Sequence, residues 1–300
     1  MIHAISRNLG GSKLARRALE GGLPEWYASR PVGASGWSQV AASVAAEFAS
    51  RSWLDELLPA FQPSGLAAER LHAVAGAQGV VVTGGQQPGL FGGPLYVLHK
   101  AVTLLEMANT LRSAIGRPVA PIFWAATDDA DFAEANHVSV VRRGKLDTLS
   151  MPQGPTAGRS MANTPLGDVS EQLARLEEAS GSAPDAAVLE AVHAAYSSGA
   201  TVGSAYVALL RSLFEPLGIA VLDASHAVVR AAGHDTILRA LRSANVVAAA
   251  IVDSSKSIAA AGFHAQLADV PNLALVFETL DDGPRRRVPL SSAISVAANA

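Results

Sequence analysis

The sequence predicts an α/β fold in which a parallel sheet is flanked by helices and interrupted by helical insertions. Three short apolar runs are typical of strands buried on both faces, and they lie at 79–83, 119–126 and 218–223. Segments with the helical spacing of apolar residues separate these runs, and this alternation indicates an α/β sheet. A glycine-rich segment joins the first run to the next helix, so that strand, loop, helix and strand follow one another as in a βαβ unit.

The elements of the first half follow from local patterns. The first thirty-odd residues are rich in glycine and proline turns, after which Ser38 begins a helical pattern. Helices are expected over three stretches: 38–58, 66–74 and 95–111. Pro121 weakens the centre of the second strand, because proline cannot donate a hydrogen bond to the ladder.

The second half alternates in the same way. A hairpin is expected around Arg143-Gly144, with strands at 137–142 and 145–150, and a long loop follows over 154–165. The later elements are expected in this order: helices 169–178, 184–196 and 202–214, strand 218–223, helices 227–241 and 245–267, and strands 273–278 and 286–290. Four parts result: a mostly helical segment 1–78, the first half of the core 79–150, a helical insertion 151–217 and the second part of the core 218–300.

The composition excludes several classes of function. Of the 300 residues, 49% are apolar and 16% are charged, and 23 Lys and Arg stand against 26 Asp and Glu, a net charge of −3. This balance argues against binding of nucleic acid, and the run Arg285-Arg286-Arg287 is interpreted as the solvated edge of a strand. No window approaches the roughly 18 apolar residues of a membrane span, no secretory signal is visible, and zero cysteine excludes disulfides and thiolate chemistry. We expect a cytoplasmic protein that acts on small molecules.

The most informative segment is the glycine-rich loop 84–94. Its five glycines allow a sharp turn and a close approach to a ligand, and the free N–H groups at the start of the next helix favour an anion. The segment is not a Walker loop, since Leu90 stands where lysine is required, and it does not contain the dinucleotide fingerprint G-x-G-x-x-G. A plain tight connection between strand and helix is the alternative.

Three side chains just inside the helix, Tyr96, His99 and Lys100, are spaced to share one face and to point back toward the loop. The spelling from Gly93 to His99 is similar to the G-P-x-H-x-G-H of class I aminoacyl-tRNA synthetases and related nucleotidyltransferases, whose histidines stabilise the phosphates of ATP. Tyr96 and Leu98 replace the first histidine and the glycine, and only His99 matches. A structural role for this histidine is the alternative.

A cluster of carboxylates follows the second strand, in the segment Thr127-Asp128-Asp129-Ala130-Asp131-Phe132-Ala133-Glu134. Such groups at the carboxyl edge of a parallel sheet occupy the usual ligand crevice, where they hold Mg²⁺, act as a general base or bind an amine. Asp223 ends the third strand and is expected at the same edge. The alternative is structural: Asp128 or Asp129 caps a short helix whose dipole favours Asp131 and Glu134.

Two blocks of residues carry a resemblance to a known family. Thr83 to Tyr96, followed by His99-Lys100-Ala101, resembles the T-G-Q-Q-x-G-L-F-x-G-P-L-Y segment of the bacillithiol biosynthesis cysteine-adding enzymes. Pro121 to Thr127, continued to Asn136-His137, is similar to that family's P-V-F-W-x-A-x-E-D-H-D-F-x-E-x-N-H. Weaker echoes follow at 213–223 and 262–266.

The resemblance implies a Rossmann-like core with helical insertions and, in the family, a C-terminal coiled-coil region that is absent here and through which a homodimer is expected. The implied reaction joins L-cysteine to glucosaminyl malate in the last step of bacillithiol biosynthesis, with ATP or another nucleotide, and Mg²⁺, as implied cofactors. The catalytic residues that it implies are His99, Asp128, Asp129 and Asp131. The residues that it implies for binding substrate or nucleotide are Thr83, Gly84, Gln86, Gln87, Gly89, Gly92, Gly93, Tyr96, Lys100, Trp124, Asn136 and His137.

Two departures from the family pattern leave alternatives open. The family's E-D-H-D is Asp128-Asp129-Ala130-Asp131 here, so that the histidine is absent and one carboxylate is shorter. The coiled-coil region has no room within 300 residues, and we expect the N-terminal portion of a family member. The alternatives are another adenylate-forming or nucleotidyl-transferring enzyme on the same core, and a truncated or degenerate binding protein without catalysis.

Overall fold

The computed structural model describes residues 11–23, 25–28, 30–47, 53–77, 79–151, 154, 158–181, 186–265, 271–280 and 283–299. The chain forms two compact units. The core unit comprises Gly33–Asp235 and Glu278–Arg286, and the second unit comprises Met1–Val32, Thr236–Phe277 and Arg287–Ala300. All residues of the candidate site described below belong to the core unit.

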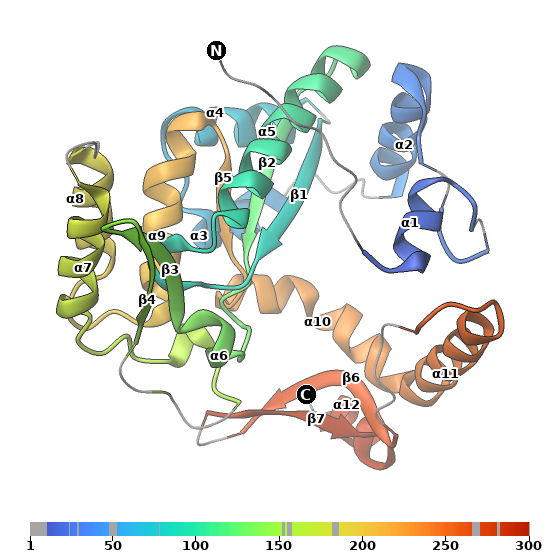
Figure 1. Cartoon of the computed structure of the whole chain (residues 1–300). Helices are drawn as coiled ribbons and strands as arrows, with labels where there is room; N and C mark the ends of the chain where they lie inside the picture. Colours follow the sequence, from blue (N-terminus) through green and yellow to red (C-terminus); the bar gives the residue numbers. More distant parts are fainter. Residues whose placement is uncertain are drawn as a thin grey trace. The chain divides into compact units, whose positions relative to one another are not determined.

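The core unit is built on a three-stranded parallel sheet, which confirms the predicted α/β fold (Figure 1). Its strands lie in the order β1-β2-β5, and their bounds are Val80–Gln86 for β1, Val119–Ala125 for β2 and Ala220–Asp223 for β5. β1 is longer than the predicted strand, because residues 84–86 continue its pairing with β2. β2 accommodates Pro121 because its pairing with β5 begins only at Ile122.

Two pairs of helices cover the two faces of this sheet. Their bounds are Tyr96–Ile115 for α5, Val202–Phe214 for α9, Trp53–Phe61 for α3 and Gly65–Gly76 for α4. α5 and α9 pack on the face that carries Val82, Phe123 and Val221. α3 and α4 pack on the opposite face, against Ile122 and Leu222. The alternation of side chains along each strand therefore divides the core into two layers.

The outer edge of the sheet differs from the prediction that its strands are buried on both faces. Val81 of β1 and Trp124 of β2 are each 40% exposed. β1 is an edge strand, and the packing of α3 and α4 is on β2 and β5. One face of β1 is therefore left open, although its residues have the apolar, β-branched character of a central strand.

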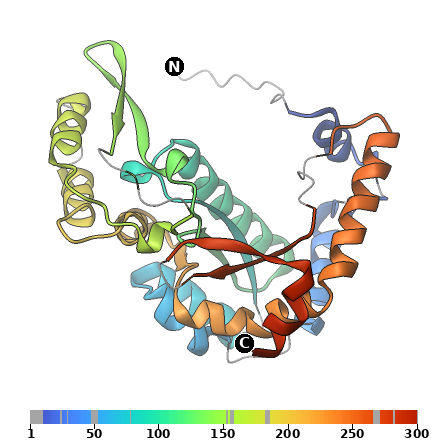
Figure 2. The same ribbon diagram turned by 90° about the horizontal axis from the view of Figure 1, so that it is seen from below.

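The predicted hairpin is present in the core unit. β3 (His137–Arg142) and β4 (Lys145–Ser150) pair antiparallel. Arg143 and Gly144 both have positive φ, 51° and 75°, as two-residue turns between twisted strands require. Figure 2 shows the hairpin extending beside α7 (Ser170–Ser180), in accord with the contacts between them.

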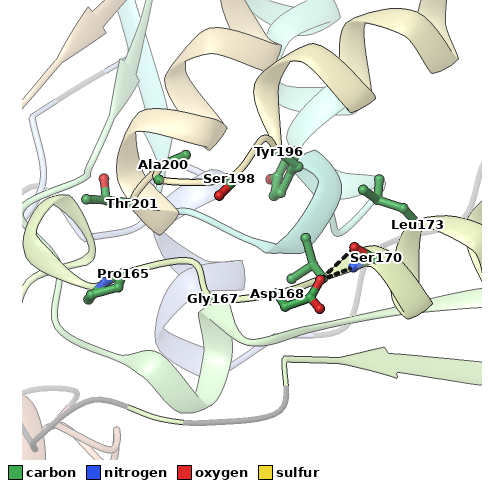
Figure 3. A pocket seen from close by; sticks show the side chains of 11 residues that line it. Pro165, Gly167, Asp168, Ser170, Leu173, Tyr196, Ser198, Ala200 and Thr201 are labelled. Carbon is green, nitrogen blue, oxygen red and sulfur yellow. Dashed lines mark hydrogen bonds between the residues drawn. The ribbon is translucent and has the colours of Figure 1, made fainter.

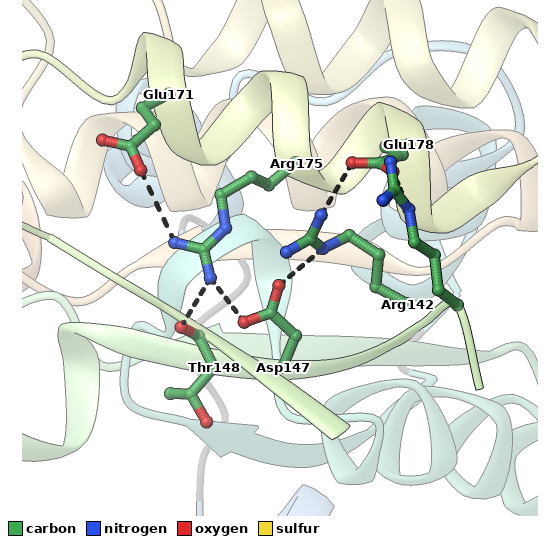
Figure 4. A network of polar contacts seen from close by, with 7 residues as sticks. Arg142, Asp147, Thr148, Glu171, Arg175 and Glu178 are labelled. Atoms are coloured by element: carbon green, nitrogen blue, oxygen red, sulfur yellow. Dashed lines mark hydrogen bonds and ion pairs between the residues drawn. The ribbon is translucent and has the colours of Figure 1, made fainter. Parts of the chain in front are cut away.

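Charged side chains join this hairpin to α7 (Figure 4). Arg142 of β3 donates to Asp147 of β4 (2.7 Å) and to Glu178 of α7 (2.8 Å), and Arg175 of α7 also pairs with Asp147. Arg143 pairs with Glu178 from the turn. The hydrogen bonds from Arg142 hold the pKa of Asp147 and the pKa of Glu178 below their usual values.

A second core lies under the helical insertion. α8 (Ala186–Ala195), α9 and the hairpin surround buried side chains that include Leu90, Leu149, Met161 and Tyr196. The remaining elements of the core unit are α2 (Gly33–Glu47), α6 (Phe132–Ala135) and 3₁₀ turns at Leu90–Gly92, Met161–Asn163 and Glu215–Leu217. α2 begins five residues earlier than predicted and packs against α5.

The second unit has a small core of its own, formed by Leu241, Ala244, Ala274, Val288, Ala293 and Ala297. Its elements, some shared with the core unit, are α1 (Lys13–Leu19), α10 (Ala227–Arg242), α11 (Ala244–Ala260), β6 (Leu273–Thr279), β7 (Arg285–Pro289), a 3₁₀ turn at Leu290–Ser292 and α12 (Ala293–Asn299). β6 and β7 form a two-stranded sheet and lie side by side in both views (Figures 1 and 2).

Three parts of this unit differ from the prediction. α1 and α12 are helices that the sequence pattern did not predict, and each is only 7 residues long. α11 ends at Ala260 rather than at 267, because Gly262 adopts positive φ (80°) and reverses the chain. The predicted start of α8 at 184 and residue 267 itself lie outside the described residues. None of the helices in the described ranges is long and apolar enough to cross a bilayer.

Candidate active site at the carboxyl edge of the sheet

The carboxyl ends of the three parallel strands meet at one edge of the sheet, and hydrogen bonds join the loops that follow them. The N–H of Ala126 donates to the carbonyl of Gln86 (3.0 Å), and the N–H of Ala224 donates to the carbonyl of Ala125 (3.1 Å). Open α/β sheets bind their ligands at this edge. The start of the glycine-rich loop and the acidic segment therefore lie next to each other, where a ligand is expected.

Asp223 also lies at this edge, and two residues hold it there. The hydroxyl of the buried Thr127 donates to Asp223 Oδ1, and the N–H and hydroxyl of Ser225 donate to the same oxygen at 3.1 and 3.0 Å. His226 comes next, and its Nδ1 accepts from the N–H of Val228 (3.3 Å), which leaves the proton of a neutral ring on Nε2. His226 was not among the predicted site residues, although it follows a buried strand just as the acidic segment does.

Four side chains form a continuous chain of hydrogen bonds across the site. Lys100 Nζ donates to Gln86 Oε1 (2.7 Å), and Gln86 Nε2 donates to Gln87 Oε1 (2.7 Å). Gln87 Nε2 then donates to a carboxylate oxygen of Glu134. Lys100 donates in addition to the carbonyl of Gly85 (2.9 Å). The two glutamines predicted to bind a ligand therefore connect an ammonium on α5 to a carboxylate on α6 and hold both in place.

The three aspartates of the acidic segment have different partners. Asp128 Oδ2 lies 3.4 Å from Nη1 of Arg285. Asp129 Oδ1 accepts from the N–H of Asp131 (2.7 Å), and Asp131 Oδ1 accepts from the N–H of Glu134 (3.1 Å) as the N-cap of α6. The structural alternative is thus realised at Asp131, while Asp128 and Asp129, the residues proposed for it, do not cap the helix.

The second half of the glycine-rich loop, residues 88–93, turns inward and packs in the second core. The N–H groups of Gly92 and Gly93 donate to the carbonyls of Gly89 and Leu90, both at 3.1 Å. The buried hydroxyl of Tyr196 donates to the carbonyl of Gly89 and accepts from the N–H of Gly92, each at 3.2 Å. Burial raises the pKa of Tyr196 above its usual value. These loop N–H groups are engaged within the protein.

Close contacts explain why several of these positions are glycine. A Cβ at Gly89 would lie 1.9 Å from the carbonyl oxygen of Gly93, and a Cβ at Gly85 would lie 2.1 Å from that of Trp124. A Cβ at Gly93 would lie 2.6 Å from the side chain of Val138 in the hairpin. The tight-connection interpretation therefore accounts for this inner part of the loop, whereas residues 84–87 stay at the sheet edge.

Comparison with known proteins assigns this arrangement to a family. The family described as "Bacillithiol biosynthesis BshC, N-terminal Rossmann-like domain" matches residues 20–296. The chain belongs to this family. Its core unit is the family's Rossmann-like fold, and the glycine-rich loop and acidic segment lie inside the matched range.

Three curated relatives, each named "Putative cysteine ligase BshC", match part of this BshC-family chain. The protein of Salinibacter ruber is 32% identical over 193 residues, which cover 63% of this chain and 35% of the relative. The protein of Koribacter versatilis is 32% identical over 205 residues (68% and 38%), and that of Anoxybacillus flavithermus is 28% identical over 229 residues (75% and 42%). The chain therefore spans less than half the length of these relatives.

The other predicted site residues of this BshC-family chain lie on α5, on β1 and at the start of the hairpin. Tyr96 is 55% exposed, with Lys100 Nζ 4.5 Å from the centre of its ring. His99 is exposed one turn along α5, and within the described ranges its ring has no hydrogen-bond partner. Thr83 is exposed on the open face of β1, and His137 Nδ1 lies 2.9 Å from Asn136 Oδ1. Within the described residues, no hydrogen bond or ion pair joins His99 to the acidic segment.

The side chains at the sheet edge fit the expected cofactors to different degrees. In the described part of the chain, no three His, Asp or Glu side chains are grouped as a metal ion requires, and Asp128, Asp129 and Asp131 each have a different partner. A magnesium ion thus stays a prediction. For a nucleotide, Lys100 and Arg285 supply the cations that phosphates need, whereas the N–H groups of 92 and 93 are already bonded.

Tyr196 also lines a cavity of about 590 Å³ in the core unit (Figure 3). One residue of its lining is charged, Asp168, whose Oδ1 accepts from the hydroxyl (2.6 Å) and the N–H (3.0 Å) of Ser170. These hydrogen bonds hold the pKa of Asp168 below its usual value. None of the residues predicted for the site lines this cavity, so the sheet edge is the candidate active site.

Proposed function

We propose that this BshC-family chain is part of a ligase that joins L-cysteine to glucosaminyl malate through an amide bond, the last step of bacillithiol biosynthesis. The observation that carries the proposal is the chain of hydrogen bonds between Lys100 and Glu134 at the sheet edge. A ligase of this kind holds an amine and a carboxylate together, and a site with a fixed cation and a fixed anion suits that pair. The names of the relatives support the same function.

The two glutamines give this site a particular electrostatic property. Direct contact between Lys100 and Glu134 would let the two charges neutralise each other. Gln86 and Gln87 lie between them instead, and each amide donates on one side and accepts on the other. Each charge is held at its own end of the chain, where it attracts a substrate group of opposite sign.

In this proposal the protein supplies positioning and charge, and a bound nucleotide would supply the phosphoryl or nucleotidyl group that activates the carboxylate of cysteine and departs when the amine forms the amide bond. Glu134 and Asp129 attract the amine of the acceptor and orient it toward that carboxyl carbon. Lys100 and Arg285 stabilise the negative charge that develops on oxygen and on the departing phosphate. ATP or another nucleotide fits this role.

A second candidate function is ligand binding without catalysis. The observation that favours it is the use of Asp129 and Asp131 in local hydrogen bonds that shape the loop. Ala130, which stands in place of the family's histidine, removes a group that transfers protons. A different adenylate-forming reaction on the same core is a third outcome that the experiment below separates.

The test is mass spectrometry of the chain incubated with L-cysteine, glucosaminyl malate and ATP with Mg²⁺, together with measurement of pyrophosphate. We expect a product with the mass of the amide conjugate. Asp129→Asn keeps the acceptor for the N–H of Asp131 but removes the charge, and we expect it to lower turnover at least about tenfold. Asp253→Asn on α11, an exposed position, is the matched control and should leave turnover unchanged.

Each alternative gives a different result in this assay. Release of pyrophosphate with another acid, and no cysteine conjugate, would indicate a different adenylate-forming enzyme. Binding of glucosaminyl malate without any product, unaltered by Asp129→Asn, would support a binding protein. Conjugate formation that Asp129→Asn leaves intact would keep the ligase and remove Asp129 from its catalytic residues.

A further inference from the structure

The cavity in the helical insertion has a size and a construction that suit a small ligand. Its volume of about 590 Å³ is within the roughly 300–1,000 Å³ that is typical of sites for small molecules. Segments 165–170 and 196–201 supply most of its lining and lie on different sides of it in Figure 3. A hydrogen bond from the N–H of Leu166 to the carbonyl of Ala200 (3.0 Å) joins these segments. The backbone therefore helps to maintain the cavity.

Two glycines of the lining leave space in the cavity. Gly167 and Gly199 have positive φ, 72° and 87°, a conformation that favours glycine. Apart from its neighbours in the chain, a Cβ at either position would meet no atom of the described residues within 4 Å. The backbone conformation therefore accounts for both glycines, and the space beside them is not filled by side chains of the described part of the chain.

The polar side of the cavity suits a cation. Asp168 is the one charged side chain among the described residues of the lining. Its Oδ1 accepts from the hydroxyl and the N–H of Ser170, and these bonds lower the pKa of Asp168, so that its carboxylate is charged at neutral pH. Within the described ranges Oδ2 has no hydrogen-bond or ion-pair partner. A negative charge with a free acceptor oxygen attracts an ammonium group and repels phosphates and carboxylates.

The apolar side of the cavity suits a hydrocarbon body. Val169, Leu173 and the ring of Tyr196 line it, and all three belong to the second core. The hydroxyl of Tyr196 is already bonded to Gly89 and Gly92, so this residue offers its ring rather than its hydroxyl to a ligand. Apolar surface of a ligand that lies against these side chains is removed from water, which favours binding.

We infer that this cavity is a binding site for a small organic amine, whose ammonium pairs with Asp168 and whose apolar body lies against Tyr196 and Leu173. A few fixed polar groups on a mainly apolar wall orient a ligand in this way. The inference is independent of the proposed ligase, since none of the residues assigned to the sheet edge lines the cavity.

The test is titration of the unmodified chain, followed by NMR chemical shifts, with three probes that share one aromatic ring. Benzylamine carries a positive charge, benzyl alcohol is neutral and benzoate is negative. We expect benzyl alcohol to bind about fivefold more weakly than benzylamine, because Asp168 is exposed and water weakens a charge pair there. Benzoate should show no saturable binding. Benzoate binding as tight as that of benzylamine would overturn the assignment to an amine, and absence of benzylamine binding would overturn the site.

Asp168→Asn tests the ion pair. The variant keeps an oxygen that accepts from Ser170 but removes the charge, so we expect benzylamine to bind about fivefold more weakly and benzyl alcohol to bind as before. The result with benzyl alcohol excludes a folding defect as the cause. Glu171→Gln is the matched control, because Glu171 is 78% exposed on α7 and does not line the cavity. Equal losses in the two variants would overturn the ion pair, since general attraction would then explain the binding.

Ser198→Phe tests the location. Ser198 lines the cavity, is exposed and, in the described part of the chain, has no hydrogen-bond partner for its hydroxyl. A phenyl group there occupies the space of the ligand, and we expect binding of benzylamine and of benzyl alcohol to fall at least about tenfold. Ser197→Phe places the same group one residue away, outside the lining, and should leave both affinities unchanged. Unaltered binding in Ser198→Phe would overturn the cavity as the site.

A competition experiment separates this site from the proposed ligase. Glucosaminyl malate, the proposed acceptor, also carries an amine, but the charge of Asp168 repels its carboxylates. We expect it not to displace benzylamine, and displacement would overturn an independent site by assigning the cavity to the acceptor. If benzylamine binds as expected and no cysteine conjugate is ever formed, the amine site stands and the ligase fails. If the conjugate forms and benzylamine does not bind, the ligase stands and the amine site fails.

Discussion

The two halves of the glycine-rich loop are both rich in glycine, but they have different tasks. Residues 84–87 extend β1 along its pairing with β2 and present Gln86 and Gln87 at the sheet edge, where they connect Lys100 to Glu134. Residues 88–93 are folded back on themselves, bonded to Tyr196 and packed in the second core. The first half positions two charged side chains of the candidate active site, and the second half fastens the loop to the helical insertion.

The difference shows what a glycine can signify. Gly89 is required because a Cβ there would collide with the backbone of Gly93, and Gly93 is required because a Cβ there would collide with Val138. A glycine-rich segment beside a strand therefore indicates that the backbone closely approaches another group. Only the structure shows whether that group belongs to a ligand or to another part of the protein. The variants below test this division of the loop in order of decreasing expected effect.

The largest effect is expected from alanine at Gly89. Its Cβ would lie 1.9 Å from the carbonyl oxygen of Gly93, so the backbone of the inner half has to move away from Tyr196. We expect the free energy of unfolding to fall by about 3 kcal/mol or more, as for other severe overpacking at a fixed backbone. Urea unfolding measures this loss.

Gly84 is the matched control in the outer half. A Cβ there would meet only the side chain of Leu104, at 3.2–3.5 Å, and that side chain can shift. Gly84→Ala should therefore cost less than about 1 kcal/mol. Equal losses at the two positions would contradict the division of the loop into an anchored half and an edge half.

A smaller effect is expected from Tyr196→Phe. The change removes two hydrogen bonds to the inner half and keeps the ring, which packs edge-on against Phe91 at 4.8 Å. Gly89 and Gly92 keep their mutual bond (3.1 Å), so the backbone is not left fully unsatisfied. We expect a loss of about 1–2 kcal/mol in the free energy of unfolding, measured by urea titration.

Tyr206→Phe is the control for this change. Tyr206 is as deeply buried on α9, but within the described residues its hydroxyl has no hydrogen-bond partner. Removing a buried, unsatisfied hydroxyl should leave stability unchanged or raise it slightly. A loss at Tyr206 as large as the loss at Tyr196 would show that ring environment, and not the bonds to the loop, determines the effect.

The fold was predictable where a local pattern determines an element. The Arg143-Gly144 pair, which needs two positive φ values, predicted the hairpin with its observed bounds. Runs such as 79–83 predicted the parallel strands, and apolar spacing predicted α5, although this helix ends at Ile115 rather than at 111. α1 and α12 were missed because 7 residues are too few to show helical periodicity.

The candidate site was predictable only in part, for a related reason. Asp128 and Asp223 were expected at one edge because the ends of parallel strands meet there, a rule that needs no knowledge of side chains. The side chain of Arg285 reaches Asp128, which lies 157 residues earlier in the chain, and no local pattern encodes such a pairing. The contacts of Tyr196 were also not predictable, since its partners Gly89 and Gly92 are far away in the sequence and are brought to it only by folding.

The smallest effect is expected from a change in the ion pairs of the hairpin, which contacts the inner half of the loop. Gly93 abuts Val138 of the hairpin, and Arg142 ties the hairpin to α7. Arg142→Gln removes the hydrogen bond that chiefly holds the pKa of Asp147 below its usual value, so this pKa should rise toward that usual value. NMR titration of the Asp147 carboxyl group measures the change.

The same bond predicts how stability depends on pH. A carboxyl group with a lowered pKa in the folded state stabilises the fold above the pKa of the unfolded chain, and this stabilisation is lost as the pH falls through the folded pKa. The unmodified chain should therefore lose stability below about pH 4 more steeply than Arg142→Gln. Arg143→Gln is the control, because Arg143 is 80% exposed and pairs with Glu178, so the pKa of Asp147 should not move. If both variants shift that pKa alike, general charge rather than the hydrogen bond from Arg142 determines it.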